Sequence, residues 1–170
     1  MRILATEQLN GVVDEFSAIA TSILPVWNGF DWVNQATRNP AWTYADILRG
    51  TASARPIADS RIDKVALLDW ANWCNTPSAN EPTKPKAQCD FIINGTSTAW
   101  QALKIVAATG DAAPTVKSGK YSITIDKLRS TPVQLFTPRN CISFSATRSF
   151  HEQPDALRVQ FIDPDEHLVS

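Results

Sequence analysis

Apolar residues recur at helical spacing in three stretches of the central part of the chain. The stretches run from Asn39 to Arg49, from Asp59 or Ser60 to Cys74, and from Thr96 or Ser97 to Thr109. Asn39 is a favoured N-cap residue and Pro40 suits the first helical position. Gly50 and Gly110 follow the first and third stretches, where a left-handed C-cap is favoured. The pattern predicts three helices, the second with Ser60 and Asp63 at capping-box spacing.

Alternating apolar and polar residues predict strands on both sides of these helices. The dipeptide Asn10-Gly11 is typical of a hairpin turn and joins residues 2–9 to residues 12–26. Two more strands flank the turn at residues 117–120, and the second of them alternates strictly. Further short strands are predicted at residues 89–94, 142–150 and 156–162, with an exposed proline-containing loop at 76–88.

Helices and strands are segregated along the chain, which predicts an α+β fold with mostly antiparallel pairing. Residues 1–36 and 137–170 form the expected β-rich portion, with antiparallel strands at both ends of the chain. Residues 37–136 form a central lobe of three helices and a small antiparallel sheet. A strand pattern at residues 159–162 lies close to Ser170, so we expect residues 1–170 to be a piece of a longer polypeptide.

Composition narrows the function classes. The 170 residues are 44% hydrophobic and 19% charged, with a net charge of −1, which disfavours a strongly basic nucleic-acid binder. No apolar run approaches the ~20 residues of a membrane span, and residues 1–8 lack a signal-peptide pattern. We expect no membrane anchor. Cys74, Cys89 and Cys141 are expected to be reduced thiols of a protein that folds in a cytosol.

Few residues are candidates for catalysis or metal binding. His151 beside Glu152 is a possible general base, but a surface histidine without a nucleophile motif is the preferred interpretation. The acidic segment 163–167 has oxygen ligands for a cation, but lacks the spacing of a calcium loop and is better interpreted as a solvated tail. The spacing of Cys74 and Cys89 does not match a zinc knuckle.

Carboxylate pairs and one glycosylation sequon remain. Asp14-Glu15 and the pair Asp59 and Asp63 are candidate glycosidase carboxylates, although helix capping explains Asp59 or Asp63 more simply. The sequon at residues 94–96 is better interpreted as a turn and helix cap. We therefore predict no catalytic residue, no cofactor and no metal, and a protein that is not an enzyme.

Tryptophan is unusually frequent, with six residues against two tyrosines. Trp27, Trp32 and Trp42 cluster in one stretch, and the other three, Trp70, Trp73 and Trp100, lie on predicted helices. Trp70 and Trp73 are one helical turn apart and could form one surface. Exposed together, these rings would form a stacking platform for sugars or bases. Buried, they would fill the core or an interface, which is the preferred interpretation because aromatic side chains dominate both.

An ordered series of short segments resembles one family. The segments are LNGVVDE (9–15), TRNPAW (37–42), DILRG (46–50), SRID (60–63), WC (73–74), CDF (89–91), WQAL (100–103), AATGDA (107–112), GKYS (119–122), TPRN (137–140) and RVQFID (158–163). Together they resemble the central region of phage tail tip attachment proteins, the host-specificity protein J family of long-tailed phages and prophages. The resemblance spans residues 9 to 165, and its specificity lies in the order of the segments.

The resemblance implies a structural protein of the virion tail tip, present in the host cytoplasm during assembly. Such proteins are baseplate-hub-like homotrimers that contact the distal tail protein, the tail tube and the tail fibre. The isolated chain is then expected to be monomeric, because the neighbouring hub domains complete the ring. The alternative function, favoured by the tryptophans, is a carbohydrate-binding or peptidoglycan-degrading tail module. Nucleic-acid binding is disfavoured by the net charge.

Overall fold

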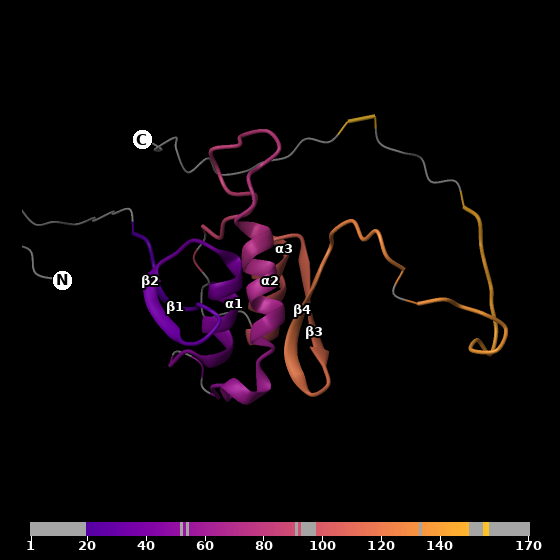
Figure 1. Ribbon diagram of the computed structural model, residues 1–170, viewed down its shortest axis with the longest axis horizontal. Helices are drawn as coiled ribbons and strands as arrows, with labels where there is room; N and C mark the ends of the chain where they lie inside the picture. The colour runs from indigo at the N-terminus through magenta and orange to yellow at the C-terminus, as the bar shows by residue number, and fades with distance from the viewer. Residues whose placement is uncertain are drawn as a thin grey trace, which may run out of the picture.

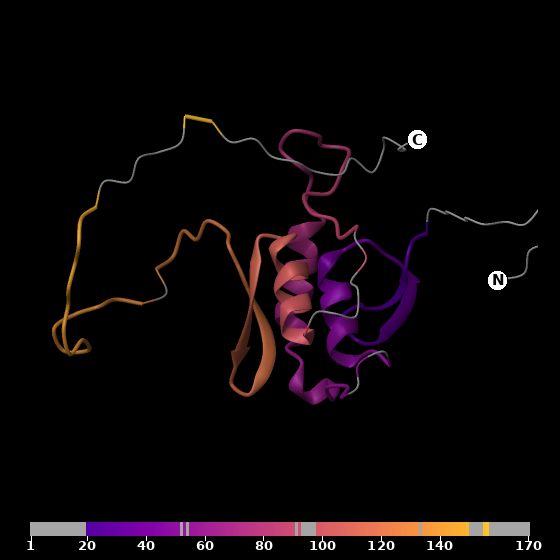
Figure 2. The same ribbon diagram turned by 180° about the vertical axis from the view of Figure 1, so that it is seen from behind.

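Three helices stand side by side between two β-hairpins in the computed structural model (Figures 1 and 2). The structure describes residues 20–51, 53, 55–90, 92, 98–132, 134–149 and 155–156. The helices are α1 (Pro40–Arg49), α2 (Lys64–Cys74) and α3 (Ala99–Ala108). The antiparallel hairpins are β1 (Ile23–Trp27) with β2 (Trp32–Ala36), and β3 (Ala112–Lys117) with β4 (Lys120–Ile125). The α+β fold class is confirmed.

Both ends of α1 are confirmed, with Asn39 as N-cap and Gly50 after Arg49, but the left-handed conformation predicted for Gly50 is wrong. Asn39 caps the helix by accepting a hydrogen bond from the Ala41 amide, and its own side-chain amide donates to the Ala71 carbonyl oxygen. Gly50 has a φ of −66° and not the left-handed value. A Cβ at this position would lie 2.5 Å from the carbonyl oxygen of Asp46. The glycine is therefore needed for close approach of the backbone and not for a positive φ.

Helix α2 begins later than predicted, because its N-cap is Asp63 and not Asp59 or Ser60. Residues Asp59–Arg61 form a separate 3₁₀ turn, and Asp63 is the N-cap, accepting from the Ala66 amide at 3.2 Å. Asp63 also ties the helix to β4: its amide donates to the Tyr121 carbonyl oxygen, and its second oxygen accepts from the Ser122 hydroxyl at 2.9 Å. The predicted start at Asp59 or Ser60 is wrong, and so is the pairing of Ser60 with Asp63 as a capping box.

We expect Asp63→Ala to lower the free energy of unfolding by about 2 kcal/mol, since it removes a helix cap and a hydrogen bond to Ser122. Asp63→Asn keeps an oxygen for the Ala66 amide and should lose less than half as much. Urea denaturation followed by circular dichroism measures both. Equal losses in the two variants would show that the cap is not what Asp63 contributes.

Helix α3 carries the capping box that the sequence pattern misplaced. Thr98 accepts from the Gln101 amide, and the Gln101 side chain accepts from the Thr98 amide. The helix therefore starts at Ala99, not at Thr96 or Ser97. The strand predicted before it is also wrong for Cys89, Asp90 and Ile92, which lie outside any strand. The Cys89 amide donates to the Arg38 carbonyl oxygen, and both Asp90 oxygens accept from the Arg38 guanidinium.

The hairpin β3–β4 is confirmed, with Ser118 and Gly119 at positive φ in its turn. The hairpin β1–β2 is absent from the prediction, although its first strand overlaps the end of the predicted strand 12–26. Its turn is held by the Asn28 side-chain oxygen, which accepts from the amides of Phe30 and Asp31. No strand forms at residues 142–149, so that prediction is wrong for them. The hairpin around Asn10-Gly11 and residues 157–162 lie outside the described residues, and Ala156 is not in a strand.

The core lies among the three helices and the inner face of β4. Its largest fully buried side chains include Trp70, Tyr44, Ile62 and Leu67. The rings of Tyr44 and Trp70 meet edge to face at 5.8 Å. The Trp70 indole donates to the Gly110 carbonyl oxygen at 2.8 Å, so the polar atom of this buried ring is satisfied.

Candidate functional site

Three tryptophans lie together where the β1–β2 hairpin meets α1. The ring centres of Trp27 and Trp32 are 5.3 Å apart, and those of Trp32 and Trp42 are 6.3 Å apart. Trp42 is buried, while Trp27 and Trp32 are half-buried. These three residues, which cluster in the sequence, also lie together in space, and their geometry decides between a ligand platform and packing.

Cations cover two of these rings. The Arg49 guanidinium lies 4.2 Å from the centre of the Trp32 ring, and the Lys64 ammonium lies 4.0 Å from that of Trp27. Asp59 accepts hydrogen bonds from the Trp32 indole at 2.6 Å and from Arg49 at 3.2 Å. We call these six residues, including Trp42, the tryptophan–cation cluster. Because cations stack on its rings, the cluster joins the hairpin to the helices instead of presenting bare faces to a sugar.

The tryptophan–cation cluster stabilises the charged form of Asp59. Burial acts to raise the pKa of its carboxyl, but the Trp32 hydrogen bond and the neighbouring Arg49 and Lys64 charges outweigh it and lower the pKa. The ionised form is thus favoured in the folded state. Its contribution to stability is present above the unfolded value of 3.8 and is lost as the pH falls through the lower folded pKa.

We expect Asp59→Asn to lower the free energy of unfolding at neutral pH by about 1 kcal/mol, a small value because the carboxylate is partly exposed and screened. The difference between the variant and the parent should shrink as the pH falls below 3.8. Thermal unfolding at neutral and acidic pH measures it. A difference that does not change with pH would contradict the assigned role of the charge.

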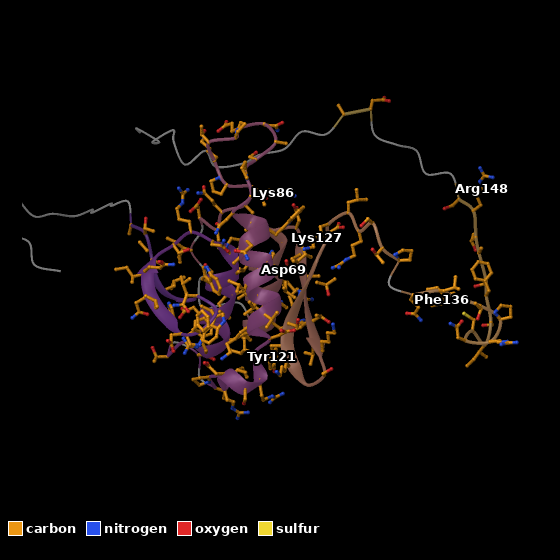
Figure 3. The ribbon with its side chains drawn as sticks, viewed as in Figure 1. Asp69, Lys86, Tyr121, Lys127, Phe136 and Arg148 are labelled. Atoms are coloured by element: carbon orange, nitrogen blue, oxygen red, sulfur yellow. The ribbon has the colours of Figure 1, made fainter. Side chains whose placement is uncertain are left out.

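The other tryptophans do not form a joint surface either. Trp70 is fully buried, while the neighbouring Trp73 is half-buried under Lys86, whose ammonium is 3.5 Å from its ring centre. Lys127 approaches the same ring at 5.9 Å and pairs with Asp69 at 3.0 Å (Figure 3). Trp100 on α3 is 40% exposed. Packing thus accounts for most of the tryptophan content, as the preferred interpretation expected.

The carboxylates predicted as candidates act in the fold. Asp59 belongs to the tryptophan–cation cluster and Asp63 caps α2. Two pockets border the β3–β4 hairpin. The one of about 480 Å³ includes Asp111, which pairs with Lys86 at 3.6 Å, and the one of about 240 Å³ includes Asp69. Asp14, Glu15, His151, Glu152, residues 94–96 and residues 163–167 lie outside the described residues.

The three cysteines are free thiols. Burial raises the pKa of Cys74 to about 12, with the Asp111 charge adding to the effect and Lys86 opposing it. Burial also raises the pKa of Cys89. Both are protonated at neutral pH and are therefore poor nucleophiles. Within the described residues there is no group of three or more metal-ligating side chains, and no helix there is long and apolar enough to cross a membrane.

An extended segment, described at residues 127–132 and 134–149, leaves the body after β4; we call residues 127–149 the arm (Figures 1 and 2). Five large apolar side chains on it are at least 70% exposed: Leu128, Leu135, Phe136, Ile142 and Phe144. The arm contains four basic residues and no acidic one, hence a net charge of +4. Figure 3 shows Phe136 and Arg148 far from the body. The arm was not predicted as a separate segment, although the sequence of residues 127–149 shows apolar residues without any acidic one.

Comparison with known proteins assigns the chain to no family. No protein-family model matches the chain, and no curated protein matches it either. The family named from the ordered segments therefore stays a prediction, and the candidate functional surface is defined by the structure alone. That surface is the arm, since the polar groups that the body offered as catalytic candidates are engaged in caps and ion pairs.

Proposed function

We propose that this chain is a structural component of a phage or prophage tail tip, of the baseplate-hub type, which acts in tail assembly and host attachment. The observation that carries the proposal is the arm, because apolar side chains exposed on an extended segment are typical of a protein that is completed by its partners. The partners in this proposal are the distal tail protein, the tail tube and the tail fibre. The full-length protein is a homotrimer in the tail tip and is assembled in the host cytoplasm.

The segments that carry the resemblance support an architectural role. Residues 37–42 supply the cap of α1, residues 107–112 include the glycine against Trp70, and residues 119–122 belong to the turn and start of β4. These positions determine how elements begin, end and pack. None of them presents an arrangement for acid–base or nucleophilic chemistry. Segments that are shared because they determine a fold, and not an active site, should contain such positions. The proposed protein is therefore a structural protein and not an enzyme.

The test is assembly in a cell that produces tails. An epitope-tagged form of the protein should copurify with tail particles through a density gradient, and labelled antibody should mark the tip in electron micrographs. Ile142→Ser/Phe144→Ser alters only the arm and should reduce this incorporation, whereas Lys104→Ala on the exposed face of α3 serves as the matched control. Recovery of the tagged protein in the soluble fraction alone, with intact tails lacking it, would overturn the proposal.

The carbohydrate-binding alternative has one observation in its favour, the 40% exposed Trp100 on α3. A single exposed ring supports a weak stacking contact and not a groove. Titration with soluble peptidoglycan fragments, followed by tryptophan fluorescence, compares the parent with Trp100→Phe and Trp100→Ala. Saturable quenching that Trp100→Ala abolishes would favour this alternative over the tail-tip proposal.

A further inference from the structure

The open edges of the two small sheets are not equivalent. In the first hairpin the Thr37 amide donates to the Ser22 carbonyl oxygen, which fixes which pairs of the ladder exchange hydrogen bonds. Since bonded pairs alternate in an antiparallel ladder, Pro25 and Asn34 face each other in a non-bonded pair. The nitrogen of Pro25, which has no hydrogen, therefore lies on the outer edge of β1. A proline at that place prevents a further strand from pairing there.

The second hairpin has two protected edges. The Asp126 amide donates to the Asp111 carbonyl oxygen, and the same alternation then places the nitrogen of Pro114 on the outer edge of β3. The outer edge of β4 is covered by the chain before α2. There the Asp63 amide donates to the Tyr121 carbonyl oxygen, and Ile62 forms a parallel bridge with Tyr121. Neither strand offers a free row of donors and acceptors.

Strand β2 alone among the four described strands lacks such protection. By the same alternation, the backbone N–H groups of Trp32, Asn34 and Ala36 point outward. The strand contains no proline and no charged residue, and its residues from Val33 onward are exposed. Proteins commonly block such an edge with charge, proline or a covering element. An unblocked edge of five residues is suited to accept another strand.

The arm contains a segment with the pattern of a missing strand. Ile142, Phe144 and Ala146 alternate with Ser143, Ser145 and Thr147, which is the period-two pattern of a strand with one buried face. Residues 142–147 make no hydrogen bond to another described residue, and Ile142 and Phe144 are almost fully exposed. The pattern that wrongly predicted a strand here is thus explained by a strand that lacks its neighbour.

We propose that residues 142–146 of one molecule pair with the outer edge of β2 in a second copy of the chain. The molecule's own β2 is disfavoured, because the arm leaves the body on the side opposite the β1–β2 hairpin (Figures 1 and 2). A second copy is the occupant because this one chain carries both halves of the contact, the unblocked edge of β2 and a segment with the pattern of a strand. The net charges of the arm (+4) and of the rest of the chain (−5) are of opposite sign, so two copies attract each other in this orientation. The added strand would also cover Val33, which is 46% exposed.

This contact joins two different surfaces, so it leads to a closed ring or an open chain and not to a two-fold dimer. It departs from the monomer expected from the resemblance alone. The inference rests on the strand edges and the arm and does not depend on the proposed tail-tip function. Self-association without incorporation into tails would overturn that function and leave this inference standing.

Sedimentation equilibrium of the full chain over a concentration series tests the proposal. The parent protein should self-associate, and Asn34→Pro, which removes an outward N–H of β2, should weaken association about tenfold or more. Ile142→Ser/Phe144→Ser should do the same by removing the apolar face of the arm. Asn34→Ala keeps the N–H and should associate like the parent. Circular dichroism and thermal unfolding confirm that each variant is folded.

Mixing the two weakened variants gives the sharper test. The Asn34→Pro protein has an intact arm, and the Ile142→Ser/Phe144→Ser protein has an intact β2 edge. An equimolar mixture should therefore form a heterodimer that stops at two molecules, since only one competent contact exists. A parent protein that stays monomeric at high concentration would overturn the proposal, as would Asn34→Pro associating like the parent or a mixture that forms no heterodimer.

Discussion

Replacing Trp70 with alanine is expected to lower the free energy of unfolding by about 3–5 kcal/mol. The ring is fully buried, packs edge to face on Tyr44, and satisfies the carbonyl oxygen of Gly110. Its removal leaves a large cavity and an unpaired buried carbonyl. Against a typical stability of about 5–15 kcal/mol this loss is large. Urea denaturation followed by circular dichroism measures it, and Trp100→Ala, at a 40% exposed position, is the matched control.

Gly110→Ala tests the same contact from the other side without creating a cavity. A Cβ at Gly110 would lie 2.7 Å from the Trp70 indole nitrogen and 2.9 Å from the Cys74 sulfur. We expect a loss of about 1–3 kcal/mol from overpacking. Adding Cys74→Ala removes one of the two clashes and should recover part of that loss. A stability of Gly110→Ala equal to that of the parent would contradict the close packing of Trp70 on this glycine.

The parts of the fold that the sequence predicted correctly are set by local chemistry. Asn39-Pro40 begins α1 because a side-chain oxygen and a residue without an N–H both suit the first turn. The Ser118-Gly119 turn defines the second hairpin for an equally local reason. The start of α2 was missed because Asp59 is held by Trp32 and Arg49, both distant in sequence. Because Trp32 and Arg49 lie outside the segment 59–74, the pattern of residues within that segment could not predict their contacts with Asp59.

The tryptophan–cation cluster and the arm show the same division between local and long-range causes. Grouping Trp27, Trp32 and Trp42 was possible from their spacing, but the cations that cover two of the rings come from α1 and α2. The β1–β2 hairpin was missed because its turn depends on the Asn28 side chain and its strands carry weak alternation. The pattern in residues 142–149 was real, yet a strand requires a neighbour. The sequence shows which residues are able to form a strand, and contacts with a neighbouring strand decide whether the strand forms.

Alkaline conditions are expected to destabilise the protein strongly between pH 9 and pH 12. Burial, with the Asp111 charge, raises the pKa of Cys74 from 9.0 to about 12, and burial, with Tyr121, raises that of Tyr44 from 10.0 to about 12. The unfolded chain therefore loses these protons at lower pH than the folded one. Their contribution to stability is complete below pH 9 and is lost as the pH rises through the folded values. The buried thiol alone should remove roughly 2 kcal/mol by about pH 11.

The slope of stability against pH separates the two groups. In Cys74→Ala the decline should begin about one pH unit later, because the remaining phenol of Tyr44 starts from 10.0 and not from 9.0. In Tyr44→Phe the decline in stability should still begin near pH 9, and only its part above pH 10 should become less steep. Urea midpoints under reducing conditions give both slopes, and Cys141→Ala, in the arm, is the matched control for removal of a thiol. A Cys74→Ala protein that declines in parallel with the parent would show that this buried thiol titrates like an exposed one. The packing around Gly110, which excludes water from the Cys74 sulfur, would then be looser than the contacts with Trp70 indicate.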